Sequence, residues 1–196
     1  ILAARDLDRL EQAAAGLRAE GIDAEAERVN VRDENAVAAL LAAVTARHGV
    51  PDLLVNNAGG QFEAPALDIT PNGFRAVVDL NLTGTWLMST DYARAAVAAD
   101  RPGRIITIVL VVEHGMPGMA HAGAARAGAI NLTRTLAREW GPHGILVNAV
   151  AGGTIDTPAL AQYDADELAA GVARLPVARM GTPREVAQAV AFLASP

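Results

Sequence analysis

The chain has 196 residues, enough for one domain with a full hydrophobic core and too few for two, so we expect a single domain over residues 1–196. It contains no cysteine, which excludes disulfides, thiolate nucleophiles and cysteine-ligated metal sites, and we expect no bound metal. Its net charge of −6 comes from interspersed acidic and basic residues, which argues against nucleic acid or a membrane surface as partner and favours a small-molecule ligand.

Apolar periodicity alternates between the helical and strand types along the chain, which is typical of an α/β domain with a parallel sheet. The chain opens in a strand-like ILAA segment. Helical spacing then follows Asp6 as far as Gly21, and Asp33 as far as Gly49. Continuous apolar runs predict buried strands at 52–55, 104–112 and 145–150. Further helices are predicted at about 71–99 and 122–140, in short pieces after Pro158 and Asp164, and from 182 onward.

A doubly wound sheet of the Rossmann type normally has a strand and a glycine-rich phosphate turn before this point, and no G-x-G-x-x-G occurs here. We therefore predict a Rossmann-like α/β fold with a parallel sheet that lacks the first strand, its glycine-rich loop and the last strand. No predicted element is the apolar run of about 20 residues that spans a bilayer. Ile1 is not followed by a secretory signal pattern, so a cytoplasmic protein is expected.

Four segments in this order make the chain resemble the classical short-chain dehydrogenase/reductase family. They are LVNNAGG at 54–60, DLNLTGT at 79–85, NLTRTLAREWGPHGILVNAVAGGTIDTP at 131–158 and RMGTPREVAQAVAFLASP at 179–196. Within the family, NNAGGQF at 56–62, NLTGTW at 81–86 and HAGAARAGAINLT at 121–133 are most similar to peroxisomal-type trans-2-enoyl-CoA reductases and their bacterial relatives. The resemblance implies an oxidoreductase, usually a homotetramer packed through the two long helices near 74–99 and 122–140.

The resemblance also implies a nicotinamide cofactor. NAD-preferring relatives carry an acid at the position of Ala4, whereas here Arg5 follows and can grip a 2′-phosphate, so NADP(H) is expected. The alternative for Arg5 is a solvated side chain at a helix start. Asn30 and Val31 stand where the family has an Asp and an aliphatic residue against adenine. The other implied cofactor-binding residues are Asn56, Asn57, Ala58, Gly59, Arg126, Gly153, Ile155 and Thr157.

The family's catalytic set is a Ser after the fifth strand, a Tyr, a Lys four residues on, and an Asn in the preceding long helix. Aligned on NLTRTLA, the Tyr position falls on Ala122, the Lys position on Arg126 and the Ser position on Val109 or Leu110. Of the four, only Asn81 matches. Arg126 can still donate to ribose hydroxyls as a permanently charged fork, but it cannot lose its proton.

His121 directly precedes the vacated Tyr position and stands at a predicted helix start. An imidazole there can donate to an enolate or relay a proton, and a helix start favours its neutral form. We therefore predict Asn81, His121 and Arg126 as the catalytic residues. His114, in the loop after the 104–112 strand, and Tyr163, in the segment that family members fold over substrate, are weaker candidates for a contact.

Reduction of a carbonyl depends on the missing acid, whereas hydride transfer to the Cβ of an enoyl thioester leaves an enolate that hydrogen-bond donors can stabilise. We therefore predict NADPH-dependent reduction of an α,β-unsaturated acyl-CoA. Two alternatives stay open. One is a non-catalytic nucleotide-binding or partner subunit of the same fold, and the other is an alcohol or ketone dehydrogenase with a displaced acid.

Overall fold

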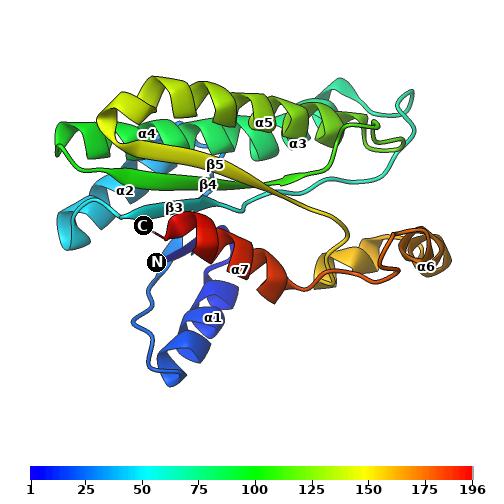
Figure 1. The fold of residues 1–196 in the computed structure, drawn as a ribbon, viewed down its shortest axis with the longest axis horizontal. Coiled ribbons are helices and arrows are strands. Elements are labelled where there is room, and N and C mark those ends of the chain that lie inside the picture. The colour runs from blue at the N-terminus through cyan, green and yellow to red at the C-terminus, as the bar shows by residue number, and fades with distance from the viewer. Residues whose placement is uncertain (196) are drawn as a thin grey trace.

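A computed structural model describes residues 1–195 and gives a parallel sheet between two layers of helices (Figure 1). Helices α2, α4 and α5 pack on one side of the strands, and α1 and α7 lie on the other. This arrangement confirms the predicted Rossmann-like fold. The strands are β1 (Leu2–Ala4), β2 (Ala26–Arg28), β3 (Leu53–Asn56), β4 (Gly103–Leu110) and β5 (Ile145–Gly152), and the helices are α1 (Leu7–Ala19), α2 (Glu34–His48), α3 (Pro71–Val78), α4 (Gly84–Ala98), α5 (Ala120–Trp140), α6 (Ala165–Ala173) and α7 (Pro183–Ala194).

The sheet is divided into two pieces, β1–β2 and β3–β4–β5. The longest pairing runs from Gly103 opposite Ile145 to Leu110 opposite Gly152, and within residues 1–195 no strand pairs with β3 on its other side. In a Rossmann sheet the first strand stands at this position, between the strands that correspond to β1 and β3. The division thus agrees with the prediction that this strand is lacking. It also leaves one side of β3 open, and Val55 is 38% exposed.

The helix ends follow the predicted capping residues. Asp6 accepts a hydrogen bond from Arg9 N (3.1 Å) at the start of α1. Asp33 accepts two, from Asn35 N (3.0 Å) and Ala36 N, at the start of α2. Gly49 ends α2 with a φ of 78°, a conformation that residues with a Cβ rarely adopt. Local side-chain chemistry therefore fixes where the first two helices begin, as the sequence indicated.

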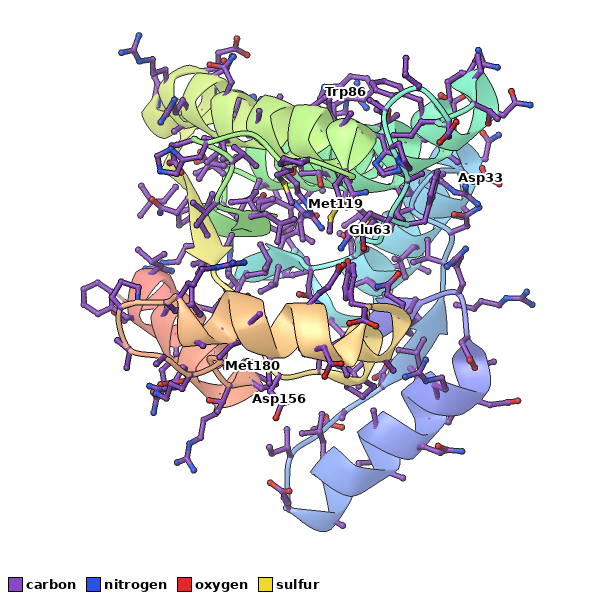
Figure 2. All side chains as sticks on the ribbon, turned by 90° about the vertical axis from the view of Figure 1, so that its right-hand side faces the viewer. Asp33, Glu63, Trp86, Met119, Asp156 and Met180 are labelled. Atoms are coloured by element: carbon purple, nitrogen blue, oxygen red, sulfur yellow. The ribbon has the colours of Figure 1, made fainter. Side chains whose placement is uncertain are left out.

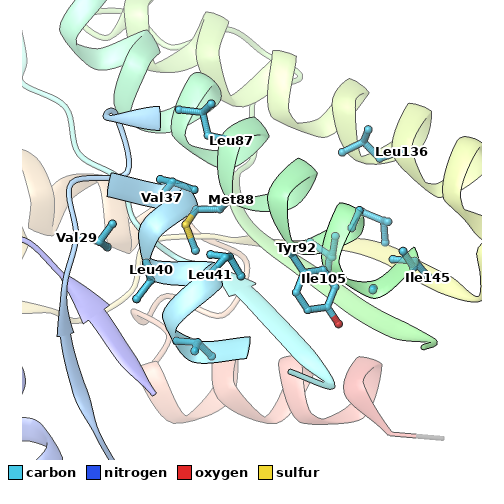
Figure 3. Close-up of a cluster of buried hydrophobic side chains, with 14 residues drawn as sticks. Val29, Val37, Leu40, Leu41, Leu87, Met88, Tyr92, Ile105, Leu136 and Ile145 are labelled. Carbon is cyan, nitrogen blue, oxygen red and sulfur yellow. The ribbon is translucent and has the colours of Figure 1, made fainter. Parts of the chain in front are cut away.

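The main hydrophobic core lies between α2, α4 and the strands (Figure 3). One stripe of α2 packs against α4, because its apolar residues recur at helical spacing. Tyr92 is fully buried in this core, and its hydroxyl donates to Pro51 O (2.8 Å). Burial raises the pKa of this phenol. Tyr92 is thus a structural residue of this cluster, which also contains Val37, Leu40, Leu41, Val44, Leu87, Met88, Ile105, Leu136 and Ile145.

The helix predicted at about 71–99 is present over residues 71–98, but it is not α-helical throughout. Between α3 and α4 lies a π-helical turn at Asp79–Thr83, a rare local widening that occurs often at functional sites. Gly84, which follows the turn, packs so closely on Val31 that a Cβ would lie 2.7 Å from Val31 Cγ2. β2 was not predicted, because its sequence, Ala-Glu-Arg, lacks an apolar run. No helix within residues 1–195 is long and apolar enough to cross a membrane.

Candidate active site

The loops that follow β3, β4 and β5 meet at one end of the sheet, on the right of Figure 1 and facing the viewer in Figure 2. Ala64 N, in the loop after β3, donates to Gly118 O (2.9 Å) in the loop after β4. Figure 2 shows Glu63 and Met119 from these two loops close together. Ligands of open parallel sheets bind beyond the carboxyl ends of the strands. The predicted site residues in these loops therefore lie at the expected end of the molecule.

Asn81 is fully buried in the π-helical turn and holds the loop after β3. Its Oδ1 accepts from Gly60 N (3.2 Å), and its Nδ2 donates to Gly60 O (2.7 Å) and to Val77 O (2.8 Å). The amide is thus joined to both backbone groups of one residue, a pattern that requires both a donor and an acceptor. Asn81 therefore fixes the position of residues 59–62.

Arg126 extends from α5 and is only 7% exposed. Its Nη1 donates to Ile108 O (2.6 Å), whereas its buried Nε has no partner. No carboxylate within residues 1–195 forms an ion pair with it. Burial lowers the pKa of the guanidinium, but an arginine remains charged. A Cβ on Gly59 would overlap Nη2, so the guanidinium packs directly against the loop and a larger residue at position 59 would displace it.

His121 lies in the first turn of α5 and is fully buried. Its Nδ1 accepts from Ala122 N (2.8 Å), so the neutral ring carries its hydrogen on Nε2. Nε2 is buried and has no partner. Burial lowers the pKa of the imidazole, and the Met119 backbone, which can accept a hydrogen bond from the protonated ring, offsets part of this effect. Phe62 packs edge-on against the ring, with centroids 4.4 Å apart. His121 is thus a neutral, unused N–H donor behind Phe62.

The lowered pKa of His121 predicts that the protein becomes less stable in mild acid. Above the unfolded-state pKa of about 6.5 the ring is neutral in both states; below it, the unfolded state binds a proton that the folded state resists. The free energy of unfolding should therefore fall by up to about 1.4 kcal/mol per pH unit below roughly pH 6.5, until the folded-state pKa is reached. Urea unfolding as a function of pH measures this slope.

His121→Gln should remove this part of the pH dependence. His114→Gln is the control, because His114 is exposed in the loop after β4 and has no buried environment to lose. Parallel pH profiles for the wild type and the His121 variant would show that His121 does not titrate as its burial implies.

The positions that correspond to the family's Ser and Tyr hold no hydroxyl. Val109 is 1% exposed and Ala122 is fully buried. A hydroxyl comes instead from the segment after β5, where Tyr163 Oη accepts a hydrogen bond from Gln61 Nε2 (2.9 Å). Gln61 and Phe62 stand inside the NNAGGQF motif but received no role from the sequence. Their position inside that motif, directly after Gly59 and Gly60, was the signal that could have identified them.

The predicted cofactor-binding residues other than Arg126 range from buried positions to exposed loops. Asn56 is buried and its Nδ2 donates to Ser89 Oγ (2.9 Å), so it ties β3 to α4. Val31 meets Asn56 and Ala58 at a small cavity, which brings the end of β2 to the end of β3. Asn57, Ala58 and Gly59 are exposed, as is Arg5 just after β1. The remaining positions are Asn30, whose Oδ1 accepts from Arg32 N (3.3 Å), Ile155, which bridges to Gly181, and Gly153 and Thr157 beside it.

No group of three or more His, Asp or Glu residues within residues 1–195 is placed to hold a metal ion. The chemical groups that the site does offer are the unpaired Nε of Arg126, the unpaired Nε2 of His121 and the exposed backbone at 57–59. A cation and a neutral donor, both from α5, thus approach the same loop. Such a site suits a ligand with hydroxyls and a developing negative charge better than a metal.

Comparison with known proteins gives matches over most or all of the chain. The family model described as "Enoyl-(Acyl carrier protein) reductase" matches residues 1–196. A Bacillus subtilis (strain 168) protein named "Probable 2,4-dienoyl-CoA reductase" is 36% identical over 86% of this chain and 68% of its own length. Cis-4-hydroxycyclohexanecarboxylate dehydrogenase of Sinomonas cyclohexanicum is 40% identical over 94% of this chain and 75% of its own length.

Among solved structures, the citronellol catabolism dehydrogenase AtuB of Pseudomonas aeruginosa PAO1 superposes with a TM-score of 0.87 at 36% identity. The match covers all of this chain and 76% of that one. The chain thus spans between about two thirds and three quarters of the length of these three proteins. The relatives share one fold but act on different kinds of compound.

Proposed function

Because the chain belongs to the classical short-chain dehydrogenase/reductase family, we propose that it is an NADPH-dependent oxidoreductase that reduces a trans-2-enoyl-CoA. The observation that carries the proposal is a buried, neutral His121 with a free N–H, next to a family Tyr position that is filled by Ala122. The site thus retains a hydrogen-bond donor but lacks the phenol acid. This combination suits the formation of an enolate better than the formation of an alkoxide.

The residues present fit a nicotinamide cofactor. Arg126 places its Nη2 against Gly59, in the exposed segment Asn57–Gly59, and a guanidinium beside this segment suits ribose hydroxyls. Arg5 is exposed after β1, where it can reach a ribose 2′-phosphate, and this supports NADPH over NADH. When bound, NADPH supplies a hydride to the Cβ of the substrate.

The chain's own residues then stabilise the negative charge that develops on the thioester oxygen. We assign this task to the Nε2–H of His121, which burial keeps neutral and which no protein group occupies. Donors that are already oriented in a dry site stabilise such charge without reorganisation. Asn81 holds the loop against which the substrate lies, through its hydrogen bonds to Gly60. Phe62 packs edge-on against His121 and Nε2 is buried, so the thioester oxygen reaches this N–H only when the Phe62 ring moves aside.

The test is NADPH oxidation by the full-length protein with crotonyl-CoA and with longer trans-2-enoyl-CoA substrates, followed by loss of NADPH absorbance. We expect turnover with the enoyl thioesters, a preference for NADPH over NADH, and identification of the saturated acyl-CoA by mass spectrometry. Absence of turnover by protein that binds NADPH would contradict the proposal.

Reduction of a ketone is the second candidate, and the relatives named as dehydrogenases favour it. Its difficulty is Ala122, because hydride transfer to a carbonyl yields a strongly basic alkoxide that needs an acid. Ala122→Tyr should restore carbonyl reduction by on the order of 10²-fold or more, the usual contribution of a positioned acid. Since Ala122 is fully buried, the added ring costs about 1–3 kcal/mol of stability, so thermal unfolding must be measured alongside activity. A folded variant with an unchanged rate on ketones would count against this candidate.

A non-catalytic nucleotide-binding role is favoured by the replacement of three of the family's four catalytic positions. Calorimetry separates it from the first candidate, because this role requires NADPH binding without turnover of enoyl thioesters or ketones.

We also propose a homo-oligomer that packs through α4 and α5. Trp86 and Val97 are 44% and 43% exposed there, and they line a groove with Leu136 and Trp140. Sedimentation of the wild type and of Trp86→Glu tests this contact.

A further inference from the structure

Residues 154–181, which we call the lid, form a long excursion between β5 and α7 that is closed at its base. Gly181 N donates to Thr154 O (2.9 Å), and Asp156 N donates to Gly181 O (2.8 Å). Arg179 pairs with Glu185 in the first turn of α7 (2.6 Å). In Figure 2, Asp156 and Met180 lie together at this closure. The base of the lid is therefore fixed to α7.

Beyond its base the lid is weakly attached. Helix α6 has no buried residue, and Figure 1 shows it projecting beyond the end of the sheet. Within residues 1–195, one side-chain hydrogen bond joins residues 157–178 to the chain that precedes the lid. In it, Gln61 Nε2 donates to Tyr163 Oη (2.9 Å), across 102 positions of sequence. This partly buried bond therefore fixes the middle of the lid against the loop after β3.

The loop side of this bond belongs to the site, because residues 59–62 each touch a different part of it. Gly59 lies against the guanidinium of Arg126, Gly60 is held by Asn81, and Phe62 packs on His121. Gln61, between Gly60 and Phe62, contacts Tyr163. The hydroxyl of Tyr163 is thus anchored to the same four-residue segment that contacts the guanidinium of Arg126 and the imidazole of His121.

The direction of the hydrogen bond leaves Tyr163 a free donor. A phenol has one hydrogen to donate and an oxygen that can also accept. Here the oxygen accepts from Gln61, and none of residues 1–195 accepts the phenol hydrogen. We propose that Tyr163 donates this hydrogen as a hydrogen bond to the thioester oxygen of the acyl substrate, as a second donor beside His121, and that Gln61 positions it for that purpose. The phenol keeps its proton, and the Cα of the enolate takes a proton from solvent water to give the saturated acyl-CoA. This inference rests on the proposed enoyl-CoA reduction. It assigns to Tyr163 of the lid the hydrogen-bonding role of the phenol that family members carry at the position of Ala122.

Two variants distinguish a Tyr163 that donates to the substrate from a Tyr163 that only holds the lid in place. Tyr163→Phe removes the hydroxyl, and kcat for crotonyl-CoA should fall on the order of 10- to 100-fold, the range for one hydrogen bond to a developing charge. Gln61→Glu keeps the size of the side chain but replaces the amide donor with a carboxylate. The phenol hydrogen then turns to that carboxylate, so the lid stays attached while the donor is lost. We expect Q61E to lose as much kcat as Y163F.

Attachment of the lid is measured independently by trypsin cleavage after Arg174, an exposed residue of the lid, followed by mass spectrometry. Y163F should be cleaved faster than the wild type, and Q61E at the wild-type rate. Gln162→Ala is the matched control: its amide donates to Ala159 O (2.9 Å) within the lid, so neither kcat nor cleavage should change.

The outcomes distinguish this inference from the proposed function. An active wild type whose kcat survives in both Y163F and Q61E, with only KM raised in Y163F, overturns the inference and leaves the reductase intact. A wild type that turns over no enoyl-CoA overturns both. Equal loss of kcat in the two variants, with cleavage faster only in Y163F, supports Tyr163 as the donor.

Discussion

Replacement of Arg126 with Met should lower kcat/KM by on the order of 10²- to 10³-fold, the cost of removing one charged donor from a dry site. The same change should leave the free energy of unfolding within about 2 kcal/mol of the wild type. These two expectations have one cause. The guanidinium is 7% exposed, has no carboxylate partner and makes one hydrogen bond, to Ile108 O. Met has a similar volume and carries no charge. The variant therefore avoids the free-energy cost of burying a charge, and this offsets the lost hydrogen bond to Ile108 O.

Three measurements test this expectation: steady-state kinetics with crotonyl-CoA, NADPH binding by calorimetry and urea unfolding. Arg134→Met is the matched control, because Arg134 lies on the exposed face of the same helix, and neither activity nor stability should change. Arg126→Lys should retain most of the activity, since a lysine at this position is the family's usual cation. A large loss of stability in R126M, comparable with its loss of activity, would instead make Arg126 a structural residue.

Much of the fold could be predicted because its signals are local. Asp6 and Asp33 cap helices through backbone amides two or three positions away, and Gly49 ends α2 in a conformation that suits glycine. The order of apolar runs predicted β3, β4 and β5. β2 was missed because two of its three residues, Glu27 and Arg28, are charged. Its pairing with β1 depends on backbone hydrogen bonds that leave no mark in side-chain polarity.

The site was predictable only as far as single positions. The motifs indicated Asn81, Arg126 and His121, but not the π-helical turn. The contacts that accompany this turn, Asn81 with Gly60 and Gly84 with Val31, join positions far apart in the sequence. The hydrogen bond between the lid and Gln61 joins positions 102 residues apart, and no local pattern specifies it. In the same way, every basic residue of this chain that is not a His is an Arg, so an Arg at position 126 does not show whether its side chain is buried. Only the fold identifies Arg126 as a cation without a partner.

Replacement of Asn81 with Ala should produce the largest loss of stability among the site variants. It leaves Gly60 N, Gly60 O and Val77 O without their partner at a fully buried position. The bond to Val77 O is buried, whereas the two bonds to Gly60 are partly buried, so water can satisfy part of what Gly60 loses. The expected cost is therefore about 2–4 kcal/mol, which corresponds to one or two fully stranded groups at 1–3 kcal/mol each. For a chain of this length the melting temperature should fall by roughly 4–16 °C. Asn131→Ala, on the exposed face of α5, is the control and should change it little.

Asn81→Asp tests whether the same residue also keeps Arg126 free. Asn81 Oδ1 lies 2.9 Å from the point where a Cβ on Gly59 would stand, and that Cβ would also overlap Arg126 Nη2. A carboxylate at 81 would therefore give the guanidinium the anionic partner that it lacks. N81D should retain more stability than N81A, because the ion pair compensates part of the lost hydrogen bonding. It should nevertheless bind NADPH at least as poorly as N81A, because the cation is then neutralised within the protein. Normal NADPH affinity in N81D would mean that the unpaired charge of Arg126 is not what holds the cofactor.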